Sequence, residues 1–526
     1  MSPVLNVNNL NAMKMTFKLF FRNYWILLLL VAVKMVLQLL IVNPAYELHR
    51  DEFLHLDQAN HLAAGYISVP PFTSWVSYLI QLLGGDIFWV RFFPALFGAF
   101  TLVFIWLIAE QLKGGILSRI LVSAIFIFSV YARINILYQP NSFDILAWTC
   151  VFYFLIRFID QERPIWLFLM MISFVLGFYN KYNIIFLLTG IFMAFMITDL
   201  RKVFITRHFY MVLSIGIILL IPNLLWQYNH QFPVISHMKV LKETQLDNID
   251  RIGFLISQLK LLFFSLPLVI LAFIAFFKSP PFKKYRVIGF TFLFAILIFT
   301  FFRAKDYYTL GLYPVLFVFG TVFLEKYLPH KINVIGPVYI VLTILTFIGI
   351  AKFIFPVLGP AEIAQNKTRF EEMGLLRWED GKNHDLPQDF ADMLGWKEMA
   401  SKALIAYNTL PDSVKRATLV FCDNYGQTGA LNFYNRGKMD EAYSFSTDYL
   451  FWIPDNIEIK NILLVGNAPD EKIQKLFEHF SKVAVVENPD ARERGTSIFL
   501  MTGAKSKFYE VFRAEMDRRK KELDCF

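Results

Sequence analysis

Acidic side chains stand beside long apolar segments in this chain, where unpaired charge is costly. Asp51 and Glu52 are neighbours in a polar stretch that follows an apolar run, and Asp144 opens another apolar run. Acids in such places are usually paired, cap a helix or line a wet cavity. A carboxylate in a wet cavity can act as a general base that removes a proton from a hydroxyl group. These three acids are therefore candidate catalytic residues.

Cationic side chains occupy two short connections between apolar runs. Lys181 lies in the first connection. The second holds two cations and two tyrosines, Arg303, Lys305, Tyr307 and Tyr308. Snorkelling of a long side chain to the membrane surface accounts for a single such cation. A phosphate group near this face accounts for all the cations together, because Lys and Arg are the usual partners of that anion.

The composition defines the environment of these groups. The chain has 526 residues, of which 56% are hydrophobic and only 18% charged, and its mean hydropathy is +0.48. A water-soluble globular protein carries about a quarter charged residues, so this composition excludes an ordinary soluble enzyme as well as a disordered chain. The formal charge of +9 is explained by cations at the cytoplasmic ends of membrane helices. The expected partner is therefore the lipid bilayer and not a nucleic acid.

Apolar segments that could hold these groups in a membrane recur up to residue 355. With a window of about 20 residues, the eleven candidate spans are 23–42, 87–109, 116–131, 142–159, 164–179, 183–199, 209–227, 254–277, 287–302, 309–325 and 333–355. Lys and Arg are concentrated in alternate connections, which predicts a cytoplasmic N-terminus. An odd number of spans then places the rest of the chain outside the cytoplasm. We therefore expect a multi-pass protein of the inner (plasma) membrane with a periplasmic active site.

The chain after residue 355 has a soluble composition. Its strand-like runs are 417–422, 461–466, 482–487 and 496–501, and they alternate with helix-like stretches at 470–480 and 506–522. This alternation predicts an α/β unit, and the lack of G-x-G-x-x-G and G-x-x-x-x-G-K-[ST] motifs gives no support to a nucleotide site. The expected fold class is a polytopic α-helical membrane protein with about 11 spans in residues 1–355, followed by a soluble periplasmic α/β domain in residues 356–526.

The connection after the first span is long and rich in acids. Asp51 and His55 are four residues apart, so they share one face if this stretch is helical. A pair of prolines then precedes a short apolar helix at 72–83, which cannot span the membrane. Two ordinary explanations stay open, since Asp57 could be a surface charge of a solvated helix and Asp144 could cap its own helix. Both acidic clusters nevertheless lie on the same side of the membrane, which favours one shared site.

Carboxylates, cations and tyrosines at one membrane face suit a reaction between a lipid-phosphate donor and a polar acceptor. The carboxylate would act as general base, and the cations would stabilise the negative charge on the leaving phosphate. The competing class is a polytopic transporter for a sugar, lipid or ion, in which acids inside the membrane relay protons or bind ions. Transporters commonly contain paired, broken helices near the midplane. No such pair is evident in the sequence, where the polar residues stand at helix ends.

Several different short motifs are spread along nearly the whole chain. In the membrane part they are Arg50-Asp51-Glu52, His61-Leu62-Ala63-Ala64-Gly65-Tyr66, Pro70-Pro71-Phe72, Val90-Arg91-Phe92, Asn141-Ser142-Phe143-Asp144, Gly177-Phe178-Tyr179-Asn180-Lys181-Tyr182, Pro222-Asn223-Leu224-Leu225-Trp226, Lys305-Asp306-Tyr307-Tyr308 and Tyr313-Pro314. In the soluble part they are Ala391-Asp392-Met393-Leu394-Gly395-Trp396 and Asp423-Asn424-Tyr425-Gly426-Gln427. In order and placement, these motifs resemble the bacterial members of glycosyltransferase family 39. That family has the GT-C fold and is related to protein O-mannosyltransferases and to the aminoarabinose transferase that modifies lipid A.

The resemblance implies an enzyme that transfers a hexosyl or pentosyl group from a polyprenyl-phosphate sugar to a periplasmic or cell-envelope acceptor, which is a lipid, a protein or a glycan. Asp51 matches the catalytic acid of the family's first loop, Glu52 its neighbour, and Asp144 the acid of the second loop. In an inverting displacement Asp51, oriented by Glu52 or by a cation, takes the acceptor proton. No cofactor is assigned, but three carboxylates could hold a divalent cation such as Mg²⁺ or Mn²⁺.

The remaining candidates would face the donor phosphate and the acceptor. The donor-phosphate-binding residues would be Lys181, Arg303, Lys305, Tyr307 and Tyr308. Lys181 fits the family pattern best among them, whereas Arg303 and Lys305 are assigned more from their chemistry. The family often has His before the paired prolines, where this chain has Val69. We therefore expect any role of that His toward the acceptor to be lost or taken over by His55 or His61.

Overall fold

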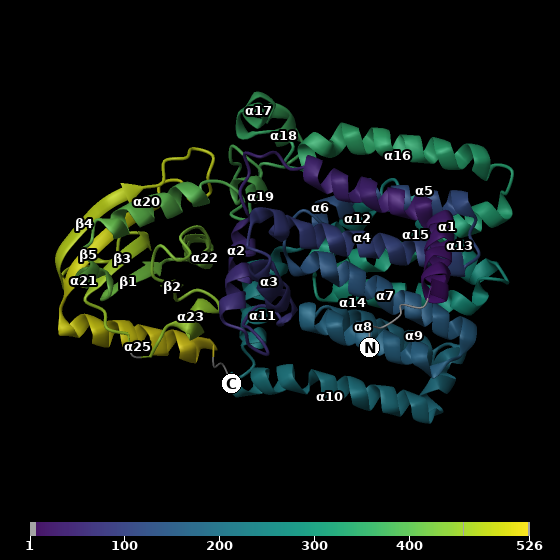
Figure 1. Ribbon diagram of the computed structural model, residues 1–526, viewed down its shortest axis with the longest axis horizontal. Coiled ribbons are helices and arrows are strands. Elements are labelled where there is room, and N and C mark those ends of the chain that lie inside the picture. The colour runs from purple at the N-terminus through teal and green to yellow at the C-terminus, as the bar shows by residue number, and fades with distance from the viewer. Residues whose placement is uncertain (1–6, 456, 524–526) are drawn as a thin grey trace.

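The computed structural model describes residues 7–455 and 457–523. A bundle of apolar helices forms one part of the molecule, and a smaller α/β unit lies beside one end of the bundle (Figure 1). Most bundle helices run along the long axis of the molecule, so that one set of helix ends faces the α/β unit. This arrangement confirms the predicted fold class, a helical membrane protein with a C-terminal α/β unit.

The bundle helices follow the predicted apolar segments. They are α1 (Val7–Leu40), α4 (Ile87–Gln111), α5 (Ile116–Ile127), α6 (Val130–Ile134), α7 (Pro140–Gln161), α8 (Pro164–Asn180), α9 (Ile184–Met196), η2 (Asp199–Ile205), α10 (Arg207–Asn229), α12 (Arg251–Leu261), α13 (Leu266–Lys278), η4 (Lys283–Tyr285), α14 (Arg286–Phe301), η5 (Asp306–Leu312), α15 (Tyr313–Tyr327) and α16 (Ile332–Ile354). Within the described residues, seven helical segments are long and apolar enough to cross a membrane, or up to nine if two bent pairs each count as one span.

Four of the eleven predicted spans are not single long helices. The helices α5 and α8 are apolar but have only 12 and 17 residues. The chain bends by 104° between α9 and η2, and by 99° between α12 and α13. The prediction of one continuous helix over 254–277 is therefore wrong. Pro267 lies in the first turn of α13, where a residue without an N–H group suits the start of a helix but not its interior.

The centre of the bundle is α15. In the segment 306–327 that contains it, 83% of the most apolar window is buried, and α4, α5, α7 and α13 pack around the helix. Gly320 permits the close approach of α13, since a Cβ atom here would lie 2.2 Å from the carbonyl oxygen of Leu268. The helices α10 and α16 instead expose many Leu, Ile and Val side chains on the outside of the bundle. Such large exposed apolar surfaces mark contact with lipid.

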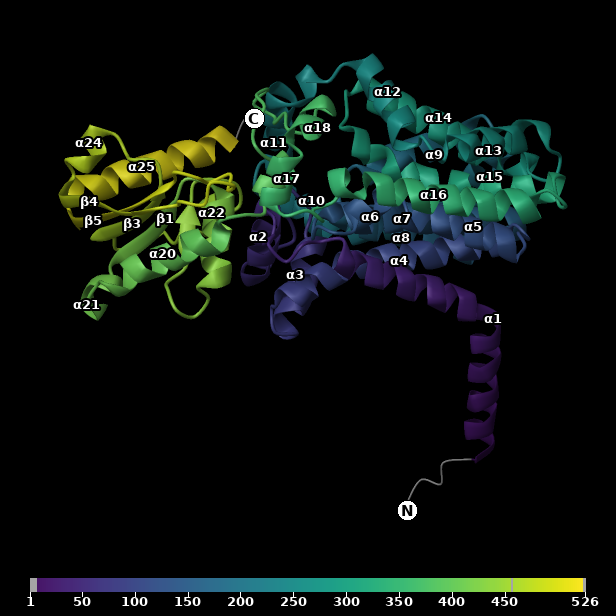
Figure 2. The same ribbon diagram turned by 90° about the horizontal axis from the view of Figure 1, so that it is seen from above.

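Short helices from distant parts of the chain lie where the bundle meets the α/β unit (Figures 1 and 2). They are α2 (Arg50–Asp57), η1 (Gln58–Asn60), α3 (Phe72–Leu82), α11 (Pro233–Thr244), η3 (Leu246–Asn248), α17 (Pro360–Gln365), α18 (Lys367–Glu372) and α19 (Gln388–Ala391). The predicted helix after the paired prolines is confirmed as α3. At the start of α2, His49 Nδ1 accepts the Asp51 N–H, and Glu52 accepts the His49 N–H. This capping box holds Asp51 in the first turn of the helix.

Five strands form the sheet of the α/β unit, in the order β2-β1-β3-β5-β4. Their bounds are β1 (Thr418–Cys422), β2 (Ala442–Ser444), β3 (Asn461–Gly466), β4 (Phe477–Val485) and β5 (Ser497–Ala504). The first three strands are parallel, with Val420 of β1 paired to Leu463 of β3, and β5 and β4 complete the sheet in antiparallel pairing. The helices of the unit are α20 (Trp396–Asn408), α21 (Asp412–Lys415), α22 (Tyr425–Tyr434), α23 (Tyr449–Trp452), α24 (Glu471–Gln474) and α25 (Ser506–Leu523).

The helix predicted over 470–480 is wrong in its second half. Only the short α24 forms, and the chain from Phe477 onward is the edge strand β4. Phe477 pairs with Ala504 of β5, and its ring packs on Phe508 of α25 at 4.7 Å between ring centres. Packing against neighbouring strands and helices outweighs the local preference of a charged, helix-like sequence.

The helix α22 brings the α/β unit into contact with α2. It follows the carboxyl end of β1 and packs along α2. Gly429 makes this contact possible, because a Cβ atom at this position would lie 2.8 Å from the Cβ of Phe53 and 2.7 Å from the Tyr449 hydroxyl. The Phe53 ring in turn packs edge-on against Trp396. Ligands of α/β folds bind outside the carboxyl ends of parallel strands, and the end of β1 is turned toward α2.

Candidate functional site

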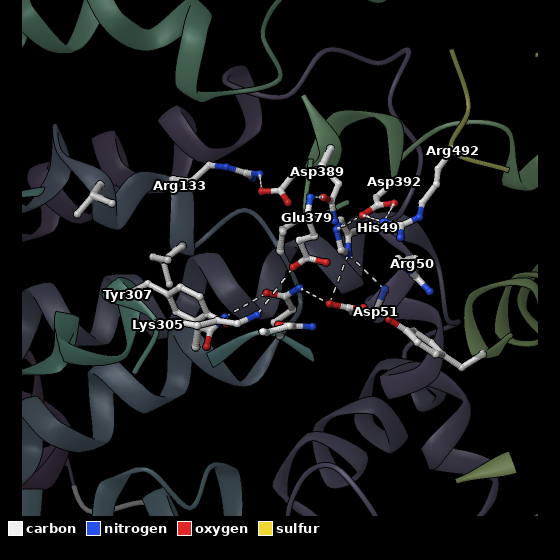
Figure 3. A pocket seen from close by; sticks show the side chains of 18 residues that line it. His49, Arg50, Asp51, Arg133, Lys305, Tyr307, Glu379, Asp389, Asp392 and Arg492 are labelled. Carbon is white, nitrogen blue, oxygen red and sulfur yellow. Dashed lines mark hydrogen bonds and ion pairs between the residues drawn. The ribbon is translucent and has the colours of Figure 1, made fainter. Parts of the chain in front are cut away.

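A polar cavity of about 450 Å³ lies between α2, the start of α7 and the α/β unit (Figure 3). Its lining comes from segments far apart in the chain: His49, Arg50, Asp51, Val130, Arg133, Ile134, Leu137, Gln139, Asn141, Gln245, Lys305, Tyr307, Glu379, Gln388, Asp389, Asp392, Tyr425 and Arg492. Carboxylates and Arg or Lys side chains are present in equal number. Such a mixture of charges suits a polar ligand that offers hydrogen-bonding groups on several sides.

Asp51 projects into this cavity from the first turn of α2. Gln139 Nε2 donates a hydrogen bond to its Oδ2 at 3.0 Å, and the Tyr425 hydroxyl donates to Oδ1 at 2.7 Å. Burial acts to raise the pKa of Asp51, but His49 and the Tyr425 hydroxyl outweigh it, so the pKa lies below its ordinary value. Asp51 is therefore a carboxylate at neutral pH, and both of its oxygens are held in place.

A line of polar groups connects Asp51 with the opposite wall of the cavity. His49 Nδ1 accepts the N–H of Asp51 at 3.2 Å, and His49 Nε2 lies 3.6 Å from Oδ2 of Asp392. Arg492 Nη1 donates to both oxygens of Asp392, at 2.9 and 3.1 Å. The α/β unit thus supports the cavity through Arg492 as well as through Tyr425.

Glu52 points away from the cavity although it follows Asp51 in the sequence. Its side chain is fully buried and accepts hydrogen bonds from the N–H groups of His49 and Tyr138, both at 2.6 Å, and from Arg91 Nη1 at 2.8 Å. These contacts join α2 to α4 and to the segment that precedes α7. They correct the expectation that Glu52 orients Asp51, because the Glu52 oxygens are engaged on the inner side of the helix.

Asp144 lies one turn inside α7 and is buried. The helix begins at Pro140, so Asp144 does not cap it, and the capping explanation is excluded. Its oxygens accept from Trp148 Nε1 at 2.9 Å and from Asn183 Nδ2 at 3.0 Å. It is not among the residues that line the cavity, but it interacts electrostatically with Lys181. The structure therefore separates Asp144 from Asp51 and groups it with the cationic end of the site.

Lys181 lies between α8 and α9, directly behind two residues of the cavity wall. Its Nζ donates to Oδ1 of Asn141 at 2.8 Å, and it stands 4.2 Å from the centre of the Tyr308 ring and 5.2 Å from that of Tyr307. Burial lowers the pKa of Lys181 to about 8, and the nearby Asp144 carboxylate acts against this shift. The ammonium group is therefore charged at neutral pH and stabilised by aromatic faces, as a partner for an anion would be.

The two cations of the second connection point in different directions. Lys305 lines the cavity, and its Nζ lies 4.0 Å from Oε1 of Glu379. Arg303 has a left-handed backbone with a φ of 54°, and its Nη1 donates to the carbonyl oxygen of Asp247 at 2.6 Å. Arg303 is not among the lining residues. The expectation that both cations face the same phosphate is thus corrected, and only Lys305 is directed toward the cavity.

The two histidines expected on the acceptor side do not line the cavity. His55 is buried within α2, with Nδ1 3.5 Å from Oε1 of Gln58. His61 Nε2 lies 2.6 Å from Oε1 of Glu441, and its ring stacks on Trp452 at 4.2 Å. His61 thus joins the first loop to the α/β unit. The structure gives neither histidine a contact with the cavity, which corrects their expected role.

The cavity therefore collects part of the predicted set and adds residues that the sequence had not singled out. From the predicted set, Asp51, Lys305 and Tyr307 line it, and Lys181 and Tyr308 lie behind its wall. The added charged and phenolic residues of the soluble part are Glu379, Asp389, Asp392, Tyr425 and Arg492. Asp392 and Tyr425 belong to the two family-like motifs of that part. Those motifs were the available signal, but their distance in sequence from Asp51 concealed the contact.

The cavity carboxylates do not form a metal site. In residues 7–455 and 457–523, no group of three or more His, Cys, Asp or Glu side chains is placed to hold a metal ion. Asp389 instead pairs with Arg133 at 2.8 Å, and Asp392 pairs with Arg492. These residues do not fit the divalent cation considered from the sequence, so no step of the chemistry is assigned to one.

Comparison with known proteins supports the resemblance that the motifs indicate. Residues 68–226 match the family described as dolichyl-phosphate-mannose-protein mannosyltransferase, a region that includes Asp144 and Lys181 and begins after Asp51. No curated protein sequence matches the chain. The resemblance to glycosyltransferase family 39 is thus confirmed for this part of the membrane bundle.

Solved structures extend the likeness to nearly the whole chain. ArnT from Cupriavidus metallidurans bound to undecaprenyl phosphate is 15% identical with a TM-score of 0.57, and the match covers 91% of this chain and 98% of that one. Its apo form is 14% identical with the same TM-score and coverage. The Archaeoglobus fulgidus oligosaccharyltransferase is 9% identical with a TM-score of 0.46, covering 85% of this chain and 68% of that one. The ArnT match shows a shared fold, of the GT-C type.

Proposed function

We propose that this chain is a membrane glycosyltransferase that moves a sugar from a polyprenyl-phosphate donor to an acceptor in the cell envelope. The observation that carries the proposal is the Asp51 carboxylate, which two donors hold in a polar cavity together with Lys305. The match to a family described as a dolichyl-phosphate-mannose-protein mannosyltransferase supports this class of reaction. The undecaprenyl phosphate bound to ArnT supports a polyprenyl phosphate as the carrier.

Asp51 acts as the general base in this proposal. An acceptor hydroxyl group beside Asp51 gives its proton to the carboxylate while its oxygen forms a bond to the anomeric carbon of the sugar. The bond between that carbon and the phosphate oxygen breaks, and its electron pair leaves with the polyprenyl phosphate. Attack on the face opposite the leaving group inverts the anomeric centre, and it needs only one carboxylate at the nucleophile. The lowered pKa of Asp51 keeps this base ionised at neutral pH.

Lys181 and Lys305 neutralise the phosphate. Lys305 and Tyr307 face the cavity and would contact a phosphate at this end, whereas Lys181 lies behind the wall, beside Tyr307 and Tyr308, and would act on the phosphate through its charge. Cations placed where negative charge develops lower the barrier for departure of the leaving group. The leaving phosphate is already anionic, so the site needs no acid to protonate it. Asp144, buried beside Lys181, then serves to hold that lysine charged.

An apolar cavity next to the polar one suits the lipid part of the donor. It has a volume of about 470 Å³ and lies between α5, α6, α12, the bend that precedes α13, and α16. Nine of its 17 lining residues are Phe, Leu or Ile, and it shares Val130 with the polar cavity. A molecule with a polar head and a long apolar chain can occupy both cavities at once. A water-soluble sugar nucleotide would leave the apolar one unused.

We place the polar cavity on the periplasmic side. Gln139 at the start of α7 lines the cavity, whereas the far end of α7 lies in a cationic region of the bundle. The cations of this region are Arg119, Arg157, Lys284 and Arg286, and their partners include Glu110, Asp160 and Asp199. Cytoplasmic ends of membrane helices are enriched in Lys and Arg. The cavity end and the α/β unit then face the periplasm.

Reconstituted protein can test this function directly. Liposomes would contain the protein and undecaprenyl-phosphate-linked hexoses or aminopentoses, and envelope extract would supply acceptors. Mass spectrometry would follow the release of undecaprenyl phosphate and the gain of sugar mass by the acceptor. We expect release from at least one donor, and a loss of roughly 10²- to 10⁴-fold in Asp51→Asn, the range for removal of a general base. Asp86→Asn is the matched control, because Asp86 is exposed and lies outside the cavity.

The transporter alternative predicts a different outcome. A transporter would move a sugar, lipid or ion across the liposome membrane without releasing undecaprenyl phosphate or forming a glycosylated product. Such transport without product, or equal turnover by wild type and Asp51→Asn, would contradict the proposed function.

A further inference from the structure

We infer that Tyr425 of the α/β unit is a positioning residue for Asp51, so that the soluble unit is part of the machinery for transfer. The inference rests on the proposed role of Asp51 as general base. Tyr425 is the first residue of α22 and lies 374 residues from Asp51 in the sequence. In the structure its hydroxyl donates to Oδ1 of Asp51 at 2.7 Å.

Two donors from opposite parts of the protein fix the Asp51 carboxylate. Gln139 of the membrane bundle holds Oδ2 at 3.0 Å, and Tyr425 of the α/β unit holds Oδ1. A carboxylate bound at both oxygens loses the freedom to rotate, so its free lone pairs keep one direction toward the cavity. Loss of either donor would release this orientation, and a base must stand within hydrogen-bond reach of the proton it takes.

The Tyr425 ring is itself held. The guanidinium group of Arg50 lies over its face at 4.6 Å from the ring centre. At the helix start, the Asn424 side chain accepts the N–H groups of Gly426 and Gln427 and completes a capping box. Gln427 also donates to Glu493 at 2.6 Å, which ties α22 to the segment before β5. Tyr425 therefore meets Asp51 from a fixed support.

The Tyr425 hydroxyl also affects the pKa of Asp51. The ionisable groups that face Asp51 are His49, Arg50 and His55 on its own segment, Tyr307 on η5 and Tyr425 on α22. Burial and the nearby Asp51 carboxylate raise the pKa of Tyr425, so its hydroxyl stays protonated and remains a donor. A donor to a carboxylate favours the ionised form. Removing the Tyr425 hydroxyl should therefore raise the pKa of Asp51 as well as free its orientation.

Tyr425→Phe tests the inference, because it keeps the ring over which Arg50 stacks and removes only the hydroxyl. The matched control is Tyr434→Phe at the other end of α22, whose hydroxyl contacts Glu47 at 3.3 Å and lies outside the cavity. In the liposome assay we expect kcat to fall roughly ten- to a hundredfold in Tyr425→Phe, as for loss of a hydrogen bond to a charged group. KM for the donor should be unchanged, since Tyr425 does not face the phosphate end. Tyr434→Phe should keep wild-type kcat.

A second measurement does not depend on turnover. Water-soluble carbodiimide modifies protonated carboxyl groups, and the Asp51 side chain is 37% exposed, so it is open to the reagent. The fraction of Asp51 modified at each pH, read from peptide masses, reports its pKa in each variant. We expect modification to persist to higher pH in Tyr425→Phe than in wild type and in Tyr434→Phe. Identical profiles in all three proteins would overturn the inference. Absence of transfer in wild type, with a shifted profile in Tyr425→Phe, would instead count against the proposed function alone.

Discussion

Glu52 and Arg91 form an ion pair on the inner side of α2, with 2.8 Å between Oε1 and Nη1. The Glu52 side chain is 0% exposed and that of Arg91 14% exposed, so water screens the pair only weakly. Asp51, one residue earlier, faces the cavity. Two adjacent acids therefore have separate tasks, since one attaches α2 to α4 and the other is available for chemistry.

Glu52→Gln should lower stability more than it lowers the chemical step. The substitution leaves Arg91 without its carboxylate, and breaking a buried pair costs about 3 kcal/mol or more. We expect a lower melting temperature for the detergent-solubilised protein, whereas Asp51→Asn should melt close to wild type. Light scattering and tryptophan fluorescence during heating would measure both. A Glu52→Gln protein that melts like the wild type but has lost turnover would show that Glu52 acts in the chemical step.

Donor use should decline at alkaline pH because of Lys181. Its pKa is lowered to about 8, so the ammonium group is charged below this pH and loses its charge as the pH rises through it. We expect kcat/KM for the donor to fall above about pH 8. Lys181→Arg should remove this decline, since a guanidinium group stays charged over the whole range. An alkaline decline that persists unchanged in Lys181→Arg would assign it to another group.

Lys305 and Arg303 should differ in their effect on donor binding, although they stand two residues apart. Lys305→Ala removes a cation from the cavity wall, and we expect KM for the donor to rise about tenfold, as for loss of a charge-assisted contact. Arg303→Ala removes a hydrogen bond to the Asp247 carbonyl at the surface and should leave KM unchanged. Titration of each variant with undecaprenyl phosphate, followed by tryptophan fluorescence, gives the same comparison without turnover. Equal losses in both variants would contradict the assignment.

Contact between α22 and α2 should be sensitive to side-chain volume at Gly429. Gly429→Val would place atoms within about 3 Å of Phe53 and of the Tyr449 hydroxyl. Overpacking of this kind costs about 1–3 kcal/mol, and it should also move Tyr425 away from Asp51. We expect a lower melting temperature together with reduced turnover. Gly349→Ala in α16 is the control, since a Cβ atom there meets nothing within 4 Å. Full turnover by Gly429→Val would show that transfer tolerates a displaced α22.

Features that depend on local sequence could be predicted. Apolar runs and the alternating pattern after residue 355 identify the bundle, α3 and four of the five strands, because burial of one face or of a whole segment leaves a periodic trace. The bend before α13, the short strand β2 and the first half of β4, which begins at Phe477, could not be predicted in this way. At Phe477 the local sequence resembles a helix, and only the pairing with β5 decides the outcome.

The candidate site, too, could be predicted only in part. Acid and cation types near the membrane face were sufficient to select Asp51, Lys305 and Lys181. The directions of their neighbours could not be predicted from spacing. Glu52 is held inward by Arg91 and by the N–H groups of His49 and Tyr138, and Arg303 turns outward with a left-handed backbone. The cavity wall that the sequence did not predict comes from the soluble part of the chain. Its contact with α2 depends on the docking of two folded units, which leaves no periodic trace in either segment.

Because part of the cavity wall comes from a late segment of the chain, the cavity can be completed only late in synthesis. The ribosome completes α2 and most of the bundle well before it reaches residues 379–492, which supply the outer wall. A nascent chain at that stage has its membrane helices and Asp51, but neither Tyr425 nor Arg492. In the proposed mechanism, sugar transfer then begins only after the C-terminal segment has folded and docked on α2. On this proposal, an unfinished polypeptide does not yet consume the lipid-linked donor.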